Sequence, residues 1–185
     1  MVLTDREIQV AIQTAQISIT PAPDVLAYSS TSLDLTLSKS LRLWKSPKAK
    51  GVEQIVVSPA AGGYVFNDVA KEHSDPKEMD SLGYILEPGD FVLGWTEEYV
   101  DLPTQSRIAA RVEGKSSLAR LGIGIHITAP TIHAGFEGKI QLEICNHGTL
   151  RVRLTPGMRV CQLIFEQTAG TPEKGYTGQF SGQIK

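Results

Sequence analysis

A short run of small, basic and hydroxyl-bearing residues is the first part of the sequence that could bind a charged ligand. Gly114-Lys115-Ser116-Ser117 lies between a strand-like run ending near Glu113 and a short helical run. The first amides of a helix are unpaired and partly positive, so this junction predicts an anion site, with a nucleotide phosphate as the candidate. The run lacks the longer glycine-rich stretch of a P-loop. The alternative is that Ser116 only caps the helix while Lys115 is solvated.

Arg120 adds a second cation to this segment. It follows Ser116 by four residues, so both side chains should lie on one face of the short helix. An arginine beside a hydroxyl can orient a water molecule or a carboxylate, and we expect the pair to serve such a site.

A carboxylate in the middle of a strand is the third chemical feature. In the run 139–146, Ile140, Leu142 and Ile144 alternate with Gln141, Glu143 and Cys145, as on a strand with one apolar face. We expect Glu143 to be partly removed from water, which favours the protonated form of a carboxyl group and suits a proton shuttle. The alternative is an exposed strand face with ordinary charges.

Short strands must position these residues. A capping box at Thr4 and Glu7, followed by Ile8, Ala11, Ile12 and Ala15 at helical spacing, predicts a short N-terminal helix. The only other predicted helix is 116–121, closed by Gly122. The stretch 45–81 predicts surface loops around one strand-like run at 54–57, without chemistry. Strands are expected at 33–37, 108–112, 124–128, 140–146 and 159–165, with a repeated L-x-P-G-x-x-V turn at 86–92 and 154–160.

The composition bounds the class of protein. The 185 residues are 41% hydrophobic and 21% charged, with a net charge of −2, which predicts one globular domain and excludes a disordered or fibrous chain. The lack of a basic excess argues against nucleic acid or a membrane surface as partner. The N-terminus lacks a signal-peptide pattern, and Cys145 and Cys161 suit buried thiols in a reducing compartment, so we expect a cytoplasmic protein.

Three blocks of residues carry a family resemblance. They are 114–122, His126-Ile127-Thr128-Ala129, and 134–143. Together they resemble the core of the dCTP deaminases, which share a superfamily with the trimeric dUTP diphosphatases. The likeness also covers Leu3-x-Asp5-Arg6-x-Ile8, Ile17 to Pro21, Leu33-Asp34-Leu35, 86–94 and the C-terminal tail.

The resemblance implies a mainly β fold: a distorted β-barrel of the β-clip, dUTPase-like type with a short N-terminal helix and one short active-site helix. It implies a single domain over 1–185, with 170–185 as a C-terminal arm closing over the nucleotide. It also implies a homotrimer with sites between subunits. The implied reaction is hydrolytic deamination of dCTP to dUTP and ammonia, with Mg²⁺ bound through the triphosphate and dTTP as a candidate inhibitor.

Residue roles also follow from the resemblance. Glu143 is implied as general base and proton shuttle, while Ser116, Arg120 and the carbonyl of Ala129 position it and the water. The implied substrate-binding residues are Lys115, Ser116, Ser117, Leu118, Ala119, Arg120, His133, Gln141, Leu142, Glu143, Tyr176, Gln179 and Gln183.

The zinc motif of other deaminases is missing from the sequence. Those enzymes hold zinc with His-x-Glu and Pro-Cys-x-x-Cys, and neither pattern occurs here. We therefore expect no zinc, and activation of water by Glu143.

Several positions depart from the family pattern. His133 stands where the family commonly has an Asp that activates water in the diphosphatases, and a neutral imidazole is not an equivalent base. Thr131 stands where the family often has an Arg or a bulky residue, and Gln179 stands where it normally has a Lys. Lys115 replaces a common Arg; the lysine keeps the positive charge but cannot form the two parallel hydrogen bonds of a guanidinium. Two alternatives stay open: a bifunctional enzyme giving dUMP and pyrophosphate, and a nucleotide-binding regulator without turnover.

Overall fold

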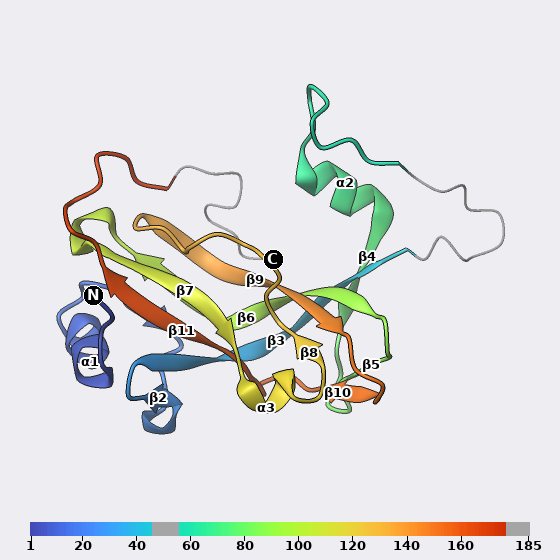
Figure 1. The fold of residues 1–185 in the computed structure, drawn as a ribbon, viewed down its shortest axis with the longest axis horizontal. Coiled ribbons are helices and arrows are strands. Elements are labelled where there is room, and N and C mark those ends of the chain that lie inside the picture. The colour runs from blue at the N-terminus through green and yellow to red at the C-terminus, as the bar shows by residue number, and fades with distance from the viewer. Residues whose placement is uncertain (46–55, 177–185) are drawn as a thin grey trace.

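Long β-strands that curve around a common interior dominate the protein (Figure 1). The computed structural model describes residues 1–45 and 56–176. Within these residues, nine strands form one sheet with the central path β7-β11-β3-β6-β9-β8, and β5 pairs with β10 separately. The mainly β, barrel-like architecture expected from the sequence is confirmed. The strands are β1 Ser18–Thr20, β2 Tyr28–Ser29, β3 Ser32–Trp44, β4 Ser74–Glu78, β5 Tyr84–Leu86, β6 Phe91–Leu102, β7 Ile108–Gly114, β8 Ile123–Gly124, β9 Phe136–Asn146, β10 Val152–Leu154 and β11 Arg159–Gln167.

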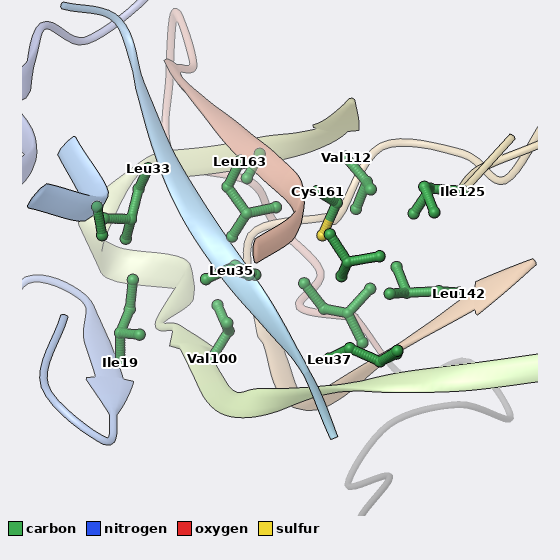
Figure 2. Close-up of a cluster of buried hydrophobic side chains, with 14 of the residues drawn as sticks. Ile19, Leu33, Leu35, Leu37, Val100, Val112, Ile125, Leu142, Cys161 and Leu163 are labelled. Atoms are coloured by element: carbon green, nitrogen blue, oxygen red, sulfur yellow. The ribbon is translucent and has the colours of Figure 1, made fainter. Parts of the chain in front are cut away.

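The core lies inside this curved sheet. Leu33, Leu35 and Leu37 of β3 are fully buried, as their alternation predicts. They meet side chains from neighbouring strands, among them Leu142 of β9 and Leu163 of β11 (Figure 2). Burying each such leucine contributes roughly 1.5–3 kcal/mol.

The N-terminal helix α1 covers Asp5–Gln13. The capping box is confirmed, because the Thr4 amide donates to Glu7 Oε2 at 3.0 Å and the Thr4 hydroxyl also contacts that oxygen. These hydrogen bonds from Thr4 lower the pKa of Glu7. The expected continuation to Ala15 is wrong: the helix ends before that residue, which takes a left-handed conformation with φ 54°.

The loop prediction for 45–81 is wrong. Helix α2, Phe66–His73, and strand β4 occupy part of this stretch, and β4 pairs antiparallel with β3. The strand has almost no apolar residues and contains Pro76, both typical of a strand at a sheet edge. Of the strand-like run 54–57, residues 54 and 55 lie outside the described residues, while 56 and 57 are not in a strand.

Three glycine turns bear out the predictions about local structure. Gly122 has φ +85° after helix α3, Ser116–Ala119, and a Cβ there would meet Gly148 N at 2.4 Å. The two Pro-Gly turns also have positive φ at Gly89 and Gly157, and the strands β5 and β10 that precede them pair with each other. The expected strand at 124–128 is shorter than predicted, since β8 ends at Gly124. No helix in residues 1–45 and 56–176 is long and apolar enough to cross a membrane.

Two carboxylates face each other across the sheet and yield a stability prediction. Asp101 of β6 lies directly opposite Glu137 of β9. Burial and then the Glu137 charge raise the pKa of Asp101. The stability that this group contributes is therefore full below the ordinary pKa of Asp and is lost as pH rises through the raised value. Asp101→Asn should stabilise the fold at pH 7 by roughly 0.2–1 kcal/mol, at the low end because solvent screens the pair.

The measurement is thermal unfolding of wild type and Asp101→Asn across pH. The gain should fade as the pH drops through the raised pKa of Asp101 and be absent below the ordinary pKa of Asp, about 4. An equal gain at pH 3.5 and pH 7 would show that charge repulsion is not its source.

Candidate active site

Glu143 lies in the middle of β9 with its side chain 25% exposed. Its chain neighbours Leu142 and Ile144 are buried in the core, so the carboxylate must point to the other face of the strand. Oε2 accepts a 3.4 Å hydrogen bond from the Ile127 amide and lies 3.7 Å from His126 Nδ1. Oε1 makes no hydrogen bond within the described residues. A partly desolvated carboxylate with one free oxygen is therefore present, as the strand alternation predicts.

Glu143 opens into a cavity of about 420 Å³. Five of the residues expected at the site line it: Ala129, His133, Gln141, Glu143 and Tyr176. The rest of the lining is mostly apolar and aromatic, as in a small-molecule site with a few polar groups. These other lining residues are Trp44, Phe66, Phe91, Leu93, Pro130, Thr131, Ile132, Phe136 and Ile140.

Sequence reasoning missed the aromatic wall of this cavity. Trp44 ends β3 and Phe66 begins α2, with their ring centroids 6.4 Å apart in an edge-to-face arrangement. Phe91 lies opposite Cys145, two residues beyond Glu143 along β9. Flat apolar surfaces of this kind suit a planar ring such as a nucleobase. The only sequence signal was an isolated Phe66 in a stretch without periodicity.

Tyr176 closes another side of the cavity. Its ring stacks on His133 at 5.7 Å and lies 6.0 Å from Phe136. Gly135 permits this packing, because a Cβ there would meet Tyr176 N at 2.6 Å. The C-terminal segment up to Tyr176 thus lies against the body of the protein. Gln179 and Gln183, the other residues expected from the arm, lie outside the described residues.

A second cavity, of about 380 Å³, is also lined by the stacked pair. It shares His133 and Tyr176 with the first cavity and adds Thr168 and Lys174 to its lining. Its walls offer an ammonium and backbone groups next to an aromatic pair, and so can hold polar parts of a ligand.

The residues around α3 do not join Glu143 within one chain. Ser116, Ser117, Ala119 and Arg120 are exposed, and no hydrogen bond or ion pair links Ser116 or Arg120 to the carboxylate in the part of the chain described. Leu118 is partly buried against the core. Leu142 is 1% exposed, so its side chain faces the core and only its backbone is left for a ligand.

Lys115 is neither solvated nor free. Its Nζ lies 2.5 Å from Asp34 Oδ1. It is also the N-cap residue of α3, so Ser116 is not the cap, and the alternative of a capping serine beside a solvated lysine is wrong.

His126 is a second residue that sequence reasoning left without a role. It belongs to the His126-Ile127-Thr128-Ala129 block, and its ring is 24% exposed beside Glu143. An imidazole at this distance can help to orient the carboxylate.

The cysteines take no part in this cavity. Both are free thiols, as expected. Cys145 Sγ lies 2.9 Å from His147 Nε2, and burial raises the pKa of its thiol and of the fully buried Cys161 thiol. Within residues 1–45 and 56–176, no three His, Cys, Asp or Glu side chains gather as they would to hold a metal ion.

Comparison with solved structures shows the fold. The 2'-deoxycytidine 5'-triphosphate deaminase from Agrobacterium tumefaciens superposes with a TM-score of 0.67 at 24% identity over 90% of this chain. This chain spans only 48% of the length of that one. A dUTPase of Staphylococcus bacteriophage 80alpha superposes with a TM-score of 0.50 at 12% identity, over 89% of this chain and 98% of its own.

Comparison of sequences shows the family. A "dCTP deaminase, dUMP-forming" from Methanobrevibacter smithii is 35% identical over 92% of this chain and 82% of its own length. A "dCTP deaminase" from Rhodospirillum rubrum is 35% identical over 100% of this chain and 92% of its own. The sequence model of the dCTP deaminase-like family matches residues 2–168. The resemblance carried by the three sequence blocks is thereby confirmed, and the chain belongs to the dCTP deaminase-like family.

Proposed function

We propose that the protein hydrolyses the exocyclic amine of dCTP, converting dCTP and water to dUTP and ammonia in the cytoplasm. The observation that carries this proposal is Glu143, a half-buried carboxylate that opens into an apolar cavity and keeps one oxygen free. A water molecule beside that oxygen meets a carboxylate that can accept its proton. Family membership supplies the substrate class.

The reaction follows from where protons have to go. Glu143 takes a proton from water as the oxygen attacks C4 of the cytosine ring. It then delivers that proton to N3, which leaves a hydroxyl and the amine on a tetrahedral C4. Glu143 next takes the proton of that hydroxyl and passes it to the amine, so that the C4 carbonyl forms as the C4–N bond breaks and ammonia leaves. The Ile127 amide and His126 hold the Oε2 side of the carboxylate, so Oε1 is the oxygen that faces water. The Ala129 carbonyl, at the cavity wall, is assigned to orient the water.

The cavity walls account for recognition of the nucleoside. Trp44, Phe66 and Phe91 offer flat apolar surfaces to the pyrimidine, while Gln141 presents an amide on the same strand face as Glu143. The His133–Tyr176 pair is assigned to the deoxyribose. Mg²⁺ comes with the substrate triphosphate, and the chemistry at C4 uses no zinc.

The site is proposed to be completed between copies in a homotrimer. In the described part of one chain, no hydrogen bond or ion pair links the exposed Ser116 and Arg120 to Glu143. Leu121 and Ile127, near these two regions, are 42% and 53% exposed, which suits an interface that buries them. A neighbouring chain that brings its α3 to the cavity would add the hydroxyl, the guanidinium and the helix amides to the site.

A second candidate function is the complete conversion of dCTP to dUMP and pyrophosphate. The name of the Methanobrevibacter smithii relative favours it. His133 favours release of dUTP, because a neutral imidazole does not match a carboxylate as the base for diphosphate hydrolysis.

Removing the base tests the reaction. With dCTP and MgCl₂, wild type should release ammonia and accumulate dUTP, and Glu143→Gln should lower kcat by roughly 10²–10⁴-fold because the amide cannot accept the proton. Glu137→Gln, an exposed site on the same strand, is the matched control and should keep its activity. Treatment with 1,10-phenanthroline should leave the rate unchanged.

The products separate the candidates. The nucleotide products are separated by chromatography. If dUMP appears without accumulated dUTP, the protein has the second function, the conversion of dCTP to dUMP and pyrophosphate. Full activity of Glu143→Gln would remove the carboxylate mechanism. Tight binding of dCTP with no product over hours would identify a nucleotide-binding regulator.

Mixing inactive variants tests the shared site. If α3 and Glu143 act from different chains, co-expressed Glu143→Gln and Arg120→Ala should form mixed trimers in which some sites have both groups intact. A fraction of the deaminase activity should return, although each variant alone is nearly inactive. Sedimentation should show trimers. No recovery in verified mixed trimers, or a monomer in solution, would mean that the site is not built between chains.

Shortening Phe66 tests the aromatic wall. Phe66→Ala should raise KM for dCTP by about 3–10-fold, with a smaller effect on kcat, because the loss is of ring contact rather than proton transfer. Tyr64→Ala is the control, since Tyr64 is exposed two residues away and does not line the cavity. If Phe66→Ala and Tyr64→Ala both had the wild-type KM for dCTP, α2 would play no part in binding.

A further inference from the structure

A buried ion pair lies beneath the junction between β7 and α3. Asp34 Oδ1 and Lys115 Nζ are 2.5 Å apart, and their side chains are only 7% and 26% exposed. The neighbours of Asp34 in β3, Leu33 and Leu35, are fully buried, so both faces of the strand are covered at this point. A carboxylate in such surroundings needs a counter-charge, and Lys115 supplies it.

The register shows how far Lys115 reaches. Asp34 lies opposite Gln162 of β11, and Gln162 lies opposite Glu113 of β7. The three strands lie side by side in the order β7, β11, β3, with α3 at the end of β7 (Figure 1). Lys115, just beyond β7, therefore extends across β11 to reach a strand two positions away.

A second tether holds the same junction. Ser32 Oγ donates to Gln162 Oε1 at 2.8 Å, and Gln162 Nε2 donates to the Gly114 carbonyl at 3.4 Å. Ser32 and Asp34 share one face of β3, being two residues apart. Two consecutive residues, Gly114 and Lys115, are thus each connected to β3, one through a glutamine and one through an ion pair.

This junction determines where α3 begins. The amides of Leu118 and Ala119 both donate to the Lys115 carbonyl, at 3.0 and 2.9 Å. The helix is a single turn, and no described side chain caps its N-terminus. A helix this short is marginal by itself, so its place depends on the residue that starts it.

We infer that Asp34 is a positioning residue: its ion pair with Lys115 fixes the start of α3, and with it Ser116 and Arg120. The roles of Ser116 and Arg120 rest on the proposed function. The ion pair and its effect on α3 do not.

The first experiment measures α3 without using activity. Hydrogen exchange of the Leu118, Ala119 and Arg120 amides, together with Tm, is followed in wild type, Lys115→Met, Asp34→Asn and the double variant. Lys115→Met should speed exchange in α3 and lower Tm by roughly 5–10 °C, because Asp34 is left buried and unpaired. The double variant should be more stable than Lys115→Met, since Asn carries no charge.

Lys139→Met is the matched control. Lys139 pairs with Glu97 at 3.4 Å and is 21% exposed, but it lies on β9 away from α3. It should leave exchange in α3 unchanged. Unchanged exchange in Lys115→Met, or a double variant less stable than Lys115→Met, would overturn the inference whether or not the protein deaminates dCTP.

Kinetics then separate positioning from phosphate binding. Lys115→Met and Asp34→Asn should lower kcat roughly 10–100-fold with KM for dCTP within about threefold, because the α3 groups are displaced. Lys115→Arg, which can keep the ion pair, should restore kcat. A tenfold or larger rise in KM for Lys115→Met alone, with Asp34→Asn normal, would instead make Lys115 a phosphate ligand. A wild type without deaminase activity would refute the proposed function and leave the exchange and Tm results to decide the ion pair.

Discussion

The alternation of side chains along β9 is the constraint on which the site depends. Ile140, Leu142 and Ile144 are at most 4% exposed, so Gln141 and Glu143 have to face the cavity. A one-residue register shift against β6 would reverse this arrangement and bury the carboxylate. Because each apolar side chain contributes roughly 1.5–3 kcal/mol, the core holds Glu143 in place more strongly than its own polar contacts do.

The short strand β8 explains the polar surroundings of Glu143. Its two residues pair with Cys145 and Asn146 at the far end of β9. This pairing brings the chain after α3 alongside β9, the strand that carries Glu143. Pairing stops at Gly124, and the chain then leaves the ladder. The Ile127 amide is therefore free to donate to Glu143 instead of to a strand partner. A strand as long as the sequence suggests would have used that amide in the sheet.

Several features that depend on neighbouring residues could be predicted, although helix α2 and the end of α1 were not, and features that depend on distant contacts could not. The capping box at Thr4, the glycine that closes α3 and the faces of β9 all follow from local pattern, and all are present. The aromatic wall could not be predicted, because Phe66 meets Trp44 only through the packing of α2. The Lys115–Asp34 pair joins residues 81 positions apart, so no motif could distinguish it from a free lysine.

The separation of Arg120 from Glu143 within one chain has a chemical consequence for the proposed mechanism. A guanidinium paired directly with Glu143 would favour the ionised carboxylate and weaken it as a proton acceptor. Within the described residues of one chain, the polar partners of Glu143 are the Ile127 amide and the His126 imidazole, in a cavity whose lining is mostly apolar and aromatic. In the proposed homotrimer, a cation from a neighbouring chain would act on the water and the substrate. Assembly between copies would then bring the carboxylate and its charged partner together, while the fold of one chain holds the carboxylate at the cavity.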